Sequence, residues 1–136
     1  MEQDSHPYSY KQAEHLKSRK AIESVFQQNN IVRVRQIKLI YSIEPADSFS
    51  YQVAFVAPKK LHHFAVDRNR NKRLMREAFR LNRQALVNAL SGKQIKLSFL
   101  IVAQNTEPLT FAEMQTRIRQ LLANLSEKVS KNCTNS

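Results

Sequence analysis

The segment that most limits the fold spans residues 67–80 and reads DRNRNKRLMREAFR. Six of its fourteen residues are Lys or Arg, and hydrophobic residues recur between them with helical spacing. On a helical wheel that advances about 100° per residue, one side of this helix and its continuation collects Asn69, Arg73, Arg76, Arg80 and Arg83. The opposite side collects Leu74, Ala78, Leu81, Ala85 and Ala89. We therefore predict a long helix whose apolar stripe packs on a sheet and whose arginine row faces outward.

The sequence before this helix predicts the first part of a single α+β domain. The chain has 136 residues, enough for one modest hydrophobic core. Helical spacing begins at Leu16 and stops at the polar residues 27–30. Two alternating, β-branched runs follow at 31–43 and 51–57, joined by the turn residues EPADSFS. We expect these two runs to pair as an antiparallel hairpin.

The sequence after the basic helix adds a strand and a helix. Gly92 stands where that helix should stop. Residues 94–104, QIKLSFLIVAQ, form the nearly continuous apolar run typical of a well-buried strand. Thr110 and Glu113 form a T-x-x-E capping box. The helix that it starts carries Met114, Ile118, Leu121, Leu122 and Leu125. We predict the order helix, two or three strands, helix, strand, helix, with a polar lead-in at 1–14, the domain at 15–127 and a polar tail at 128–136.

The charge balance indicates a polyanionic partner. The chain carries 22 Lys and Arg against 11 Asp and Glu, a formal net charge of +11. Nine of the 22 cations lie between Lys59 and Arg83, where only Asp67 and Glu77 oppose them. A merely solvated face would carry more acidic residues four positions from the arginines. Nucleic acid is the leading candidate and an anionic membrane surface the second, although no apolar run is long enough to span a bilayer.

Local signals indicate where an anion would bind. Asp67 suits the N-cap of the basic helix, because its carboxylate can accept from free backbone N–H groups. Arg68, Asn69 and Arg70 would then lie at the helix start, where such N–H groups attract phosphate. The Asn69 amide both donates and accepts, so it can orient an arginine or contact a base or a metal-bound water.

The sequence offers no catalytic residues and no metal site. Two-metal nucleases need clustered carboxylates, whereas the eleven acidic residues are scattered and show no D-x-D, D-x-E or H-E-x-x-H spacing. The adjacent His62 and His63 would point to opposite faces of a strand. The single cysteine, Cys133, cannot form an internal disulfide, which fits a reducing compartment. We therefore predict that the chain carries no hydrolytic machinery of its own.

The block RNRNKRLMREAFR, residues 68–80, resembles the RNR signature of the protein subunit of bacterial ribonuclease P. That RNA-based enzyme trims the 5′ leader from precursor tRNA. LKSRKAIESVF is similar to the first helix of the family, VAFVAPKK to its strand that ends in a lysine pair, and LSFLIVAQ to its later buried strand. The resemblance covers residues 16–125. It implies the order α-β-β-β-α-β-α, a mixed sheet with a left-handed β-α-β crossover, and a likeness to the second domain of certain ribosomal proteins.

The resemblance also implies two RNA-binding surfaces. The first would face the catalytic RNA with Arg68, Asn69, Arg70, Lys72, Arg73, Arg76 and Arg80. The second would be a cleft for the single-stranded leader, lined by Ile22, Phe26, Tyr41, Lys59 and Lys60. Proteins bind single strands with a basic groove and aromatic platforms on which bases stack, and these residue types supply both.

Three positions depart from the family pattern. Ile22 stands where a second aromatic residue is expected, so only apolar contact remains there. Pro58 stands where Ser is common, which removes a hydroxyl and a backbone donor. The loop LHHFAVD, residues 61–67, lacks the usual glycine and is longer than expected.

The implied partners are the catalytic RNA subunit, with one protein per RNA, and precursor tRNA, but neither a membrane nor DNA. Mg²⁺ would be held mainly by the RNA subunit, which contains the catalytic centre, and this chain would be an accessory subunit in the cytoplasm. A rival is a non-catalytic RNA-binding protein, such as a ribosomal protein with a similar split β-α-β core. It explains the charge but not the RNR block. A DNA-reading helix fits less well, because phosphate contacts alone specify no bases.

Overall fold

The computed structural model describes residues 19–61 and 64–134, which form three helices and four strands. In chain order the elements are α1 (Arg19–Gln28), β1 (Asn30–Val34), β2 (Ile37–Pro45), β3 (Ser50–Val56), α2 (Ala65–Leu90), β4 (Ile95–Ala103) and α3 (Phe111–Thr134). This is the predicted α-β-β-β-α-β-α order.

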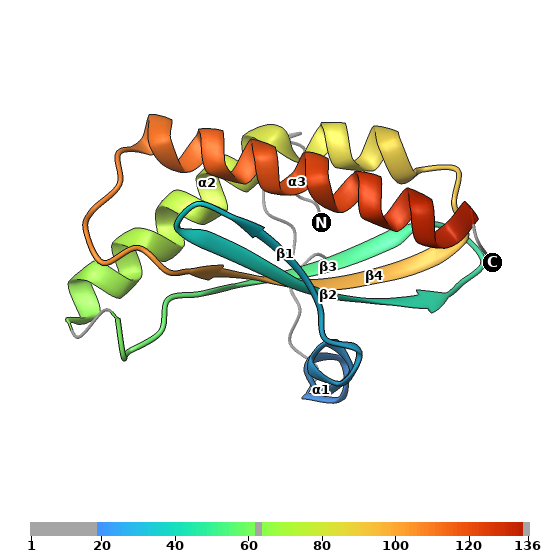
Figure 1. Ribbon diagram of the computed structural model, residues 1–136, viewed down its shortest axis with the longest axis horizontal. Helices are drawn as coiled ribbons and strands as arrows, with labels where there is room; N and C mark the ends of the chain where they lie inside the picture. Colours follow the sequence, from blue (N-terminus) through green and yellow to red (C-terminus); the bar gives the residue numbers. More distant parts are fainter. Residues whose placement is uncertain (1–18, 62–63, 135–136) are drawn as a thin grey trace, which may run out of the picture.

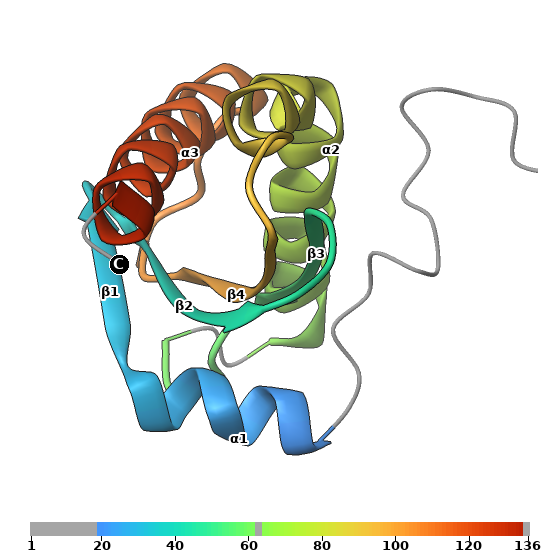
Figure 2. The same cartoon turned by 90° about the vertical axis from the view of Figure 1, so that its right-hand side faces the viewer.

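The four strands form one mixed sheet in the order β1-β2-β4-β3. β2 pairs antiparallel with both β1 and β4, whereas β3 and β4 are parallel and are connected through α2. Helices α2 and α3 cover one face of the sheet, and α1 lies against the other (Figures 1 and 2). The predicted single α+β domain with a mixed sheet is confirmed. The left-handed sense of the β3-α2-β4 crossover stays a prediction from the resemblance.

The predicted hairpin between residues 31–43 and 51–57 is wrong. β4 lies between β2 and β3 and pairs with both. β4 is buried along almost its whole length, so the central position gives its apolar side chains cover on both faces. The run 31–43 is itself the hairpin, since β1 and β2 are joined at Gln36, which has a positive φ of 72°.

Two clusters of buried side chains lie on opposite faces of the sheet. The larger one fills the space under α2 and α3, where the ring of Phe79 meets those of Tyr51, Phe55 and Phe99 with centroids 5.9 Å apart. The smaller one joins Val25 of α1 to the sheet. The sheet therefore holds a thick core on one face and leaves the α1 face thinly covered.

Helix α2 buries a different face from the predicted one. Its buried residues are Asn71, Met75, Ala78, Phe79, Arg83, Leu86 and Leu90, which centre about 90° around the helix from the predicted stripe. Leu81, Ala85 and Ala89 are exposed, and Arg83, predicted to face outward, is only 8% exposed. The prediction weighted small and large residues equally. Burial free energy grows with apolar area, so the large side chains of Met75 and Phe79 decide which face packs.

The start of α2 also differs from the prediction. The helix begins at Ala65 with Phe64 as its N-cap, so Asp67 lies in the first turn and is not the cap. The backbone N–H groups of Asp67 and Arg68 both donate to the Phe64 carbonyl, each at 3.1 Å. From Arg68 onward the backbone donors thus lie inside the helix, and only side chains are available there to bind phosphate.

Helix α3 confirms the predicted capping box and corrects the predicted domain end. The Thr110 N–H donates to Glu113 Oε1 at 2.9 Å, and the Glu113 N–H donates to Thr110 Oγ1 at 3.1 Å. All five apolar residues predicted for its packed face are buried. The helix continues to Thr134 and Val129 is fully buried, so the polar tail predicted from residue 128 is wrong. Within residues 19–61 and 64–134, no helix has the length and apolar composition needed to cross a bilayer.

Candidate RNA-binding surface

The outward side of α2 presents the amide and guanidinium groups of three predicted residues. Asn69, Arg73 and Arg76 are exposed at spacings of four and three residues, which places them along one side of the helix. Arg68 and Lys72 are half-buried beside them. These side chains form the α2 surface, which can contact phosphates without rearrangement of the helix.

The predicted Arg70 and Arg80 make contacts within the chain. Arg70 donates from Nη2 to the Leu109 carbonyl oxygen at 2.8 Å and so joins the start of α2 to the segment before α3. Arg80 forms an ion pair with Glu77 one turn earlier on the same helix. Their guanidinium groups therefore have a structural role in this conformation in addition to any contact with RNA.

Hydrogen bonds hold one side of α1 against strand β2, and the opposite side of the helix is the one that remains open. Gln28 accepts from the Ile43 N–H at 3.0 Å, and Ser24 Oγ lies 3.4 Å from Glu44 Oε1. Both partners belong to the C-terminal half of β2. The opposite flank, with Ile22 and Phe26, therefore faces the other half of the sheet. Ile22 is half-buried against the small cluster, and Phe26 is 53% exposed.

A row of paired residues crosses all four strands in that half of the sheet. Arg33 of β1 is opposite Lys38 of β2, Lys38 is opposite Val102 of β4, and Val102 is opposite Val56 of β3. They share the α1 face, because side chains alternate along a strand and each lies two residues from a position packed around α1. The row thus combines two cations with an apolar floor.

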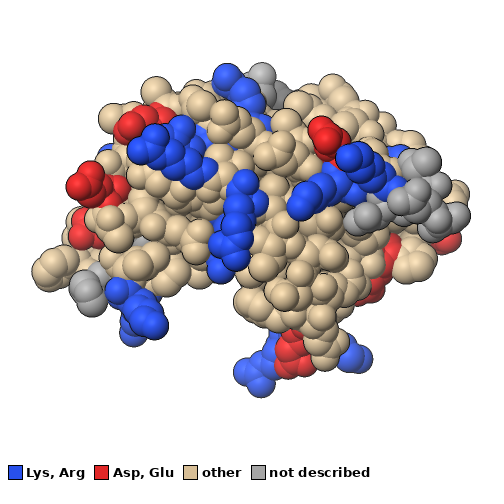
Figure 3. Space-filling model, viewed as in Figure 1, with Lys and Arg blue, Asp and Glu red and all other residues tan. Residues whose placement is uncertain are grey.

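The predicted lysine pair follows Val56, the β3 member of this row, by three and four residues in the sequence. Lys59 and Lys60 are exposed in the segment that follows β3. We call Phe26, the cross-strand row and these lysines together the α1 surface. Figure 3 shows this underside hollowed between the α1 lobe and the part of the molecule that carries the start of α2, with Lys and Arg side chains on both.

Tyr41 does not belong to the α1 surface. It is 2% exposed and packs in the large cluster under α2 and α3, on the opposite face of the sheet from Phe26. The predicted role of Tyr41 in a leader cleft is wrong. Adjacent strand positions face opposite sides of the sheet, so the residue before Tyr41 faces α1 and Tyr41 itself does not. The neighbouring Ile40 faces α1 and packs with Val25 and Leu100.

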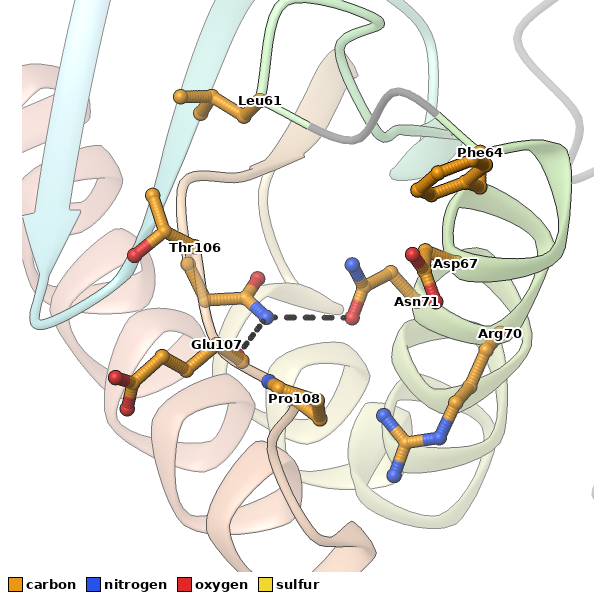
Figure 4. Close-up of a pocket in the computed structure, with 9 residues that line it drawn as sticks. Leu61, Phe64, Asp67, Arg70, Asn71, Thr106, Glu107 and Pro108 are labelled. Atoms are coloured by element: carbon orange, nitrogen blue, oxygen red, sulfur yellow. Dashed lines mark hydrogen bonds between the residues drawn. The ribbon is translucent and has the colours of Figure 1, made fainter.

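A small cavity at the start of α2 was not predicted. It has a volume of about 200 Å³ and is lined by Leu61, Phe64, Asp67, Arg70, Asn71, Asn105, Thr106, Glu107 and Pro108 (Figure 4). Asn71 and Asn105 are 3% and 2% exposed, and Asn105 Nδ2 donates to the Glu107 carbonyl at 2.7 Å and lies 3.4 Å from Asn71 Oδ1. The signal in the sequence was Asn71, a polar residue on the side of α2 that is buried in the structure. The predicted apolar stripe and the predicted arginine row both left it out.

Hydrogen bonds at the start of α3 shift the titration of one carboxyl group. The pKa of Glu113 is lowered, chiefly by the hydrogen bond from the Thr110 backbone and then by that from its side chain. In the described parts of the chain, no three His, Cys, Asp or Glu side chains come together as a possible metal site. His62 and His63 lie outside the described residues.

Comparison with known proteins identifies the family. The family model described as Ribonuclease P matches residues 10–126. The ribonuclease P protein component of Chlorobaculum tepidum is 37% identical over 119 residues, which cover 80% of this chain and 77% of the relative. That of Porphyromonas gingivalis is 30% identical over 131 residues, covering 92% and 95%. The chain belongs to the ribonuclease P protein family. Its function is that of the accessory protein component of an endoribonuclease, in tRNA processing.

Solved structures show the same fold. The Staphylococcus aureus RNase P protein at 2.0 Å superposes with a TM-score of 0.63 at 19% identity, covering 84% of this chain and 96% of that chain. The RNase P protein from Thermotoga maritima gives 0.62 at 17% identity, covering 82% and 96%. An RNA partner within a ribonucleoprotein follows from membership of the family.

Proposed function

We propose that this subunit binds the single-stranded 5′ leader of precursor tRNA on its α1 surface and the catalytic RNA on its α2 surface. The proposal depends on the exposed ring of Phe26, which lies on the side of α1 that faces the half of the sheet containing Arg33 and Lys38. An aromatic platform next to cations is the arrangement with which proteins bind single strands, at about 1–3 kcal/mol per stacked base. The lysine pair after β3 continues the positive charge along the same path.

The α2 surface suits a folded RNA partner. Asn69, Arg73 and Arg76 stand on a rigid helix, so their spacing can match fixed phosphates rather than a flexible strand. A guanidinium can bond two phosphate oxygens at once, which favours arginine for this contact. We assign the catalytic RNA to this surface, with Arg68, Lys72 and the polar atoms of Arg70 and Arg80 at its edges.

The hydrolytic step belongs to the RNA in this proposal. Mg²⁺ would be held by the RNA subunit, where it would activate the water that attacks the phosphodiester bond. This chain would hold the leader, favour precursor over mature tRNA, and screen repulsion between the two RNAs so that less Mg²⁺ suffices. We expect one protein per catalytic RNA, acting in the cytoplasm.

The test compares precursor and mature tRNA binding to the assembled ribonucleoprotein. Phe26→Ala should weaken binding of the precursor about tenfold and leave mature tRNA unchanged, since only the precursor carries a leader. Phe111→Ala is the matched control, because this ring is 36% exposed on α3, across the sheet from α1. Tyr41→Phe should also leave precursor binding unchanged.

The rival function makes a different prediction in the same experiment. A general RNA-binding protein would lose affinity for both tRNAs in parallel, or for neither. Equal losses would therefore overturn the leader-binding proposal. Steep salt dependence would not separate the two, because any protein with this charge shows it.

A further inference from the structure

We infer that the cavity at the start of α2 takes one unpaired adenine base of an RNA strand. The inference rests on the proposed function, which brings RNA to both surfaces that flank this cavity. At about 200 Å³, the cavity is smaller than the roughly 300–1,000 Å³ pockets of drug-sized ligands. A single planar base is the part of RNA that fits such a space.

The rim of the cavity carries an aromatic side chain with no part in the core. Phe64 is 72% exposed although it lies directly before α2, and Leu61 lies across the opening from it (Figure 4). An exposed phenylalanine ring forgoes the favourable free energy of burial, so stability of the fold alone does not account for the position of Phe64. Unpaired RNA bases stack on such rings.

The floor of the cavity carries a buried amide with an unused donor. Asn71 is 3% exposed, and its side chain points into the cavity (Figure 4). Its Oδ1 faces Asn105 Nδ2 at 3.4 Å, and its Nδ2 makes no hydrogen bond with the residues that the structure describes. Because Oδ1 is the atom that takes the contact from Asn105, Nδ2 is left to donate to an acceptor on a ligand.

The amide selects the base. An asparagine pairs with adenine by donating to N7 and accepting from the N6 amino group. Asn71 can do both, since Oδ1 has a second lone pair beside the long contact from Asn105. Guanine carries an acceptor, O6, where adenine has the amino group, and would place it against Oδ1.

The charges at the opening favour a base over a phosphate. Asp67 lines the cavity beside Asn71 and would repel a phosphate group. The Arg70 guanidinium, also in the lining, is already bonded to the Leu109 carbonyl. The backbone of the strand would therefore stay outside, near the exposed cations of the α2 surface, while the base enters.

The test maps the reactivity of adenine N7 in both RNAs of the assembled ribonucleoprotein. We expect one adenine to be protected by the wild-type protein and by Phe64→Tyr, which keeps the ring. Phe64→Ala should expose that adenine again. Val66→Ala is the matched control, because Val66 is 76% exposed two residues further on and does not line the cavity. Replacing the protected adenine with its 7-deaza analogue should weaken wild-type binding about tenfold.

The position of the protected adenine identifies its source. Protection in the catalytic RNA would assign the cavity to assembly of the ribonucleoprotein, and protection in the leader would assign it to substrate selection. Stimulated cleavage with no protected adenine, or protection that Phe64→Ala leaves intact, would overturn the inference alone. Failure of the wild-type protein to bind either RNA would overturn the proposed function as well.

Discussion

The arginines of α2 divide into two classes, and their substitution should separate binding from stability. Arg73 is exposed, whereas Arg70 donates to the Leu109 carbonyl at 2.8 Å. Each phosphate that a protein neutralises contributes about 0.7–0.9 to the slope of log affinity against log salt concentration. Arg73→Ala should therefore flatten that slope for the catalytic RNA by about 0.7–0.9.

The size of the effect is measurable. Over a fourfold rise in salt concentration, one phosphate contact that contributes about 0.9 to the slope accounts for an affinity loss of about 3.5-fold. Arg73→Ala lacks this contact, so that part of the loss should be absent. Its free energy of unfolding should change by less than about 0.5 kcal/mol, because the side chain is on the surface. Arg70→Ala should lower the free energy of unfolding by about 1–3 kcal/mol, since a hydrogen bond from a charged group is lost.

The assay is filter binding across a salt series, combined with urea unfolding of the same preparations. Lys131→Ala is the control for net charge, because Lys131 is exposed in the last turn of α3, far from the start of α2 (Figure 1). Its salt slope should match that of the wild type. An unchanged slope in Arg73→Ala, or a flattened slope with unchanged stability in Arg70→Ala, would refute this division.

Three further predictions concern the stability of the domain. Thr110→Ala should lower the free energy of unfolding in urea by about 1 kcal/mol through loss of the α3 cap, and no change would contradict the capping geometry. The pKa of Glu113 is lowered in the folded state, so its contribution to stability is present above the unfolded-state pKa and is lost as pH falls through the folded-state pKa. Glu113→Gln should therefore show a smaller fall in thermal stability on acidification, and an equal fall would exclude this source. Phe79→Ala should cost about 3–5 kcal/mol in urea unfolding, and a cost below about 1 kcal/mol would mean that the core is not centred on this ring.

The sequence predicted the elements well because their signals are local. Helical spacing, alternation and the capping box depend on neighbours within a few residues, and each of them appears in the structure. Strand pairing is different. The 26-residue helix α2 separates β3 from β4 in the chain. β4 nevertheless inserts between β2 and β3, and no local signal in residues 31–57 encodes that placement.

The candidate site was predicted in part for the same reason. Phe26 and the exposed residues of α2 have the exposure expected for binding. Tyr41 was misplaced because a shift of one residue along a strand reverses the face. Whether Arg70 and Arg83 face solvent depends on contacts far along the chain, such as the Leu109 carbonyl, so helical spacing alone could not decide it.

The central claim is that this chain assists an RNA-catalysed cleavage through the α1 and α2 surfaces. The most direct measurement is cleavage of precursor tRNA by the catalytic RNA of the source organism at low Mg²⁺, with and without the protein. We expect stimulation by the wild type that is largely lost in a Phe26→Ala/Arg73→Ala variant with an intact fold. Tight binding of both RNAs with no stimulation by the wild type would contradict the account.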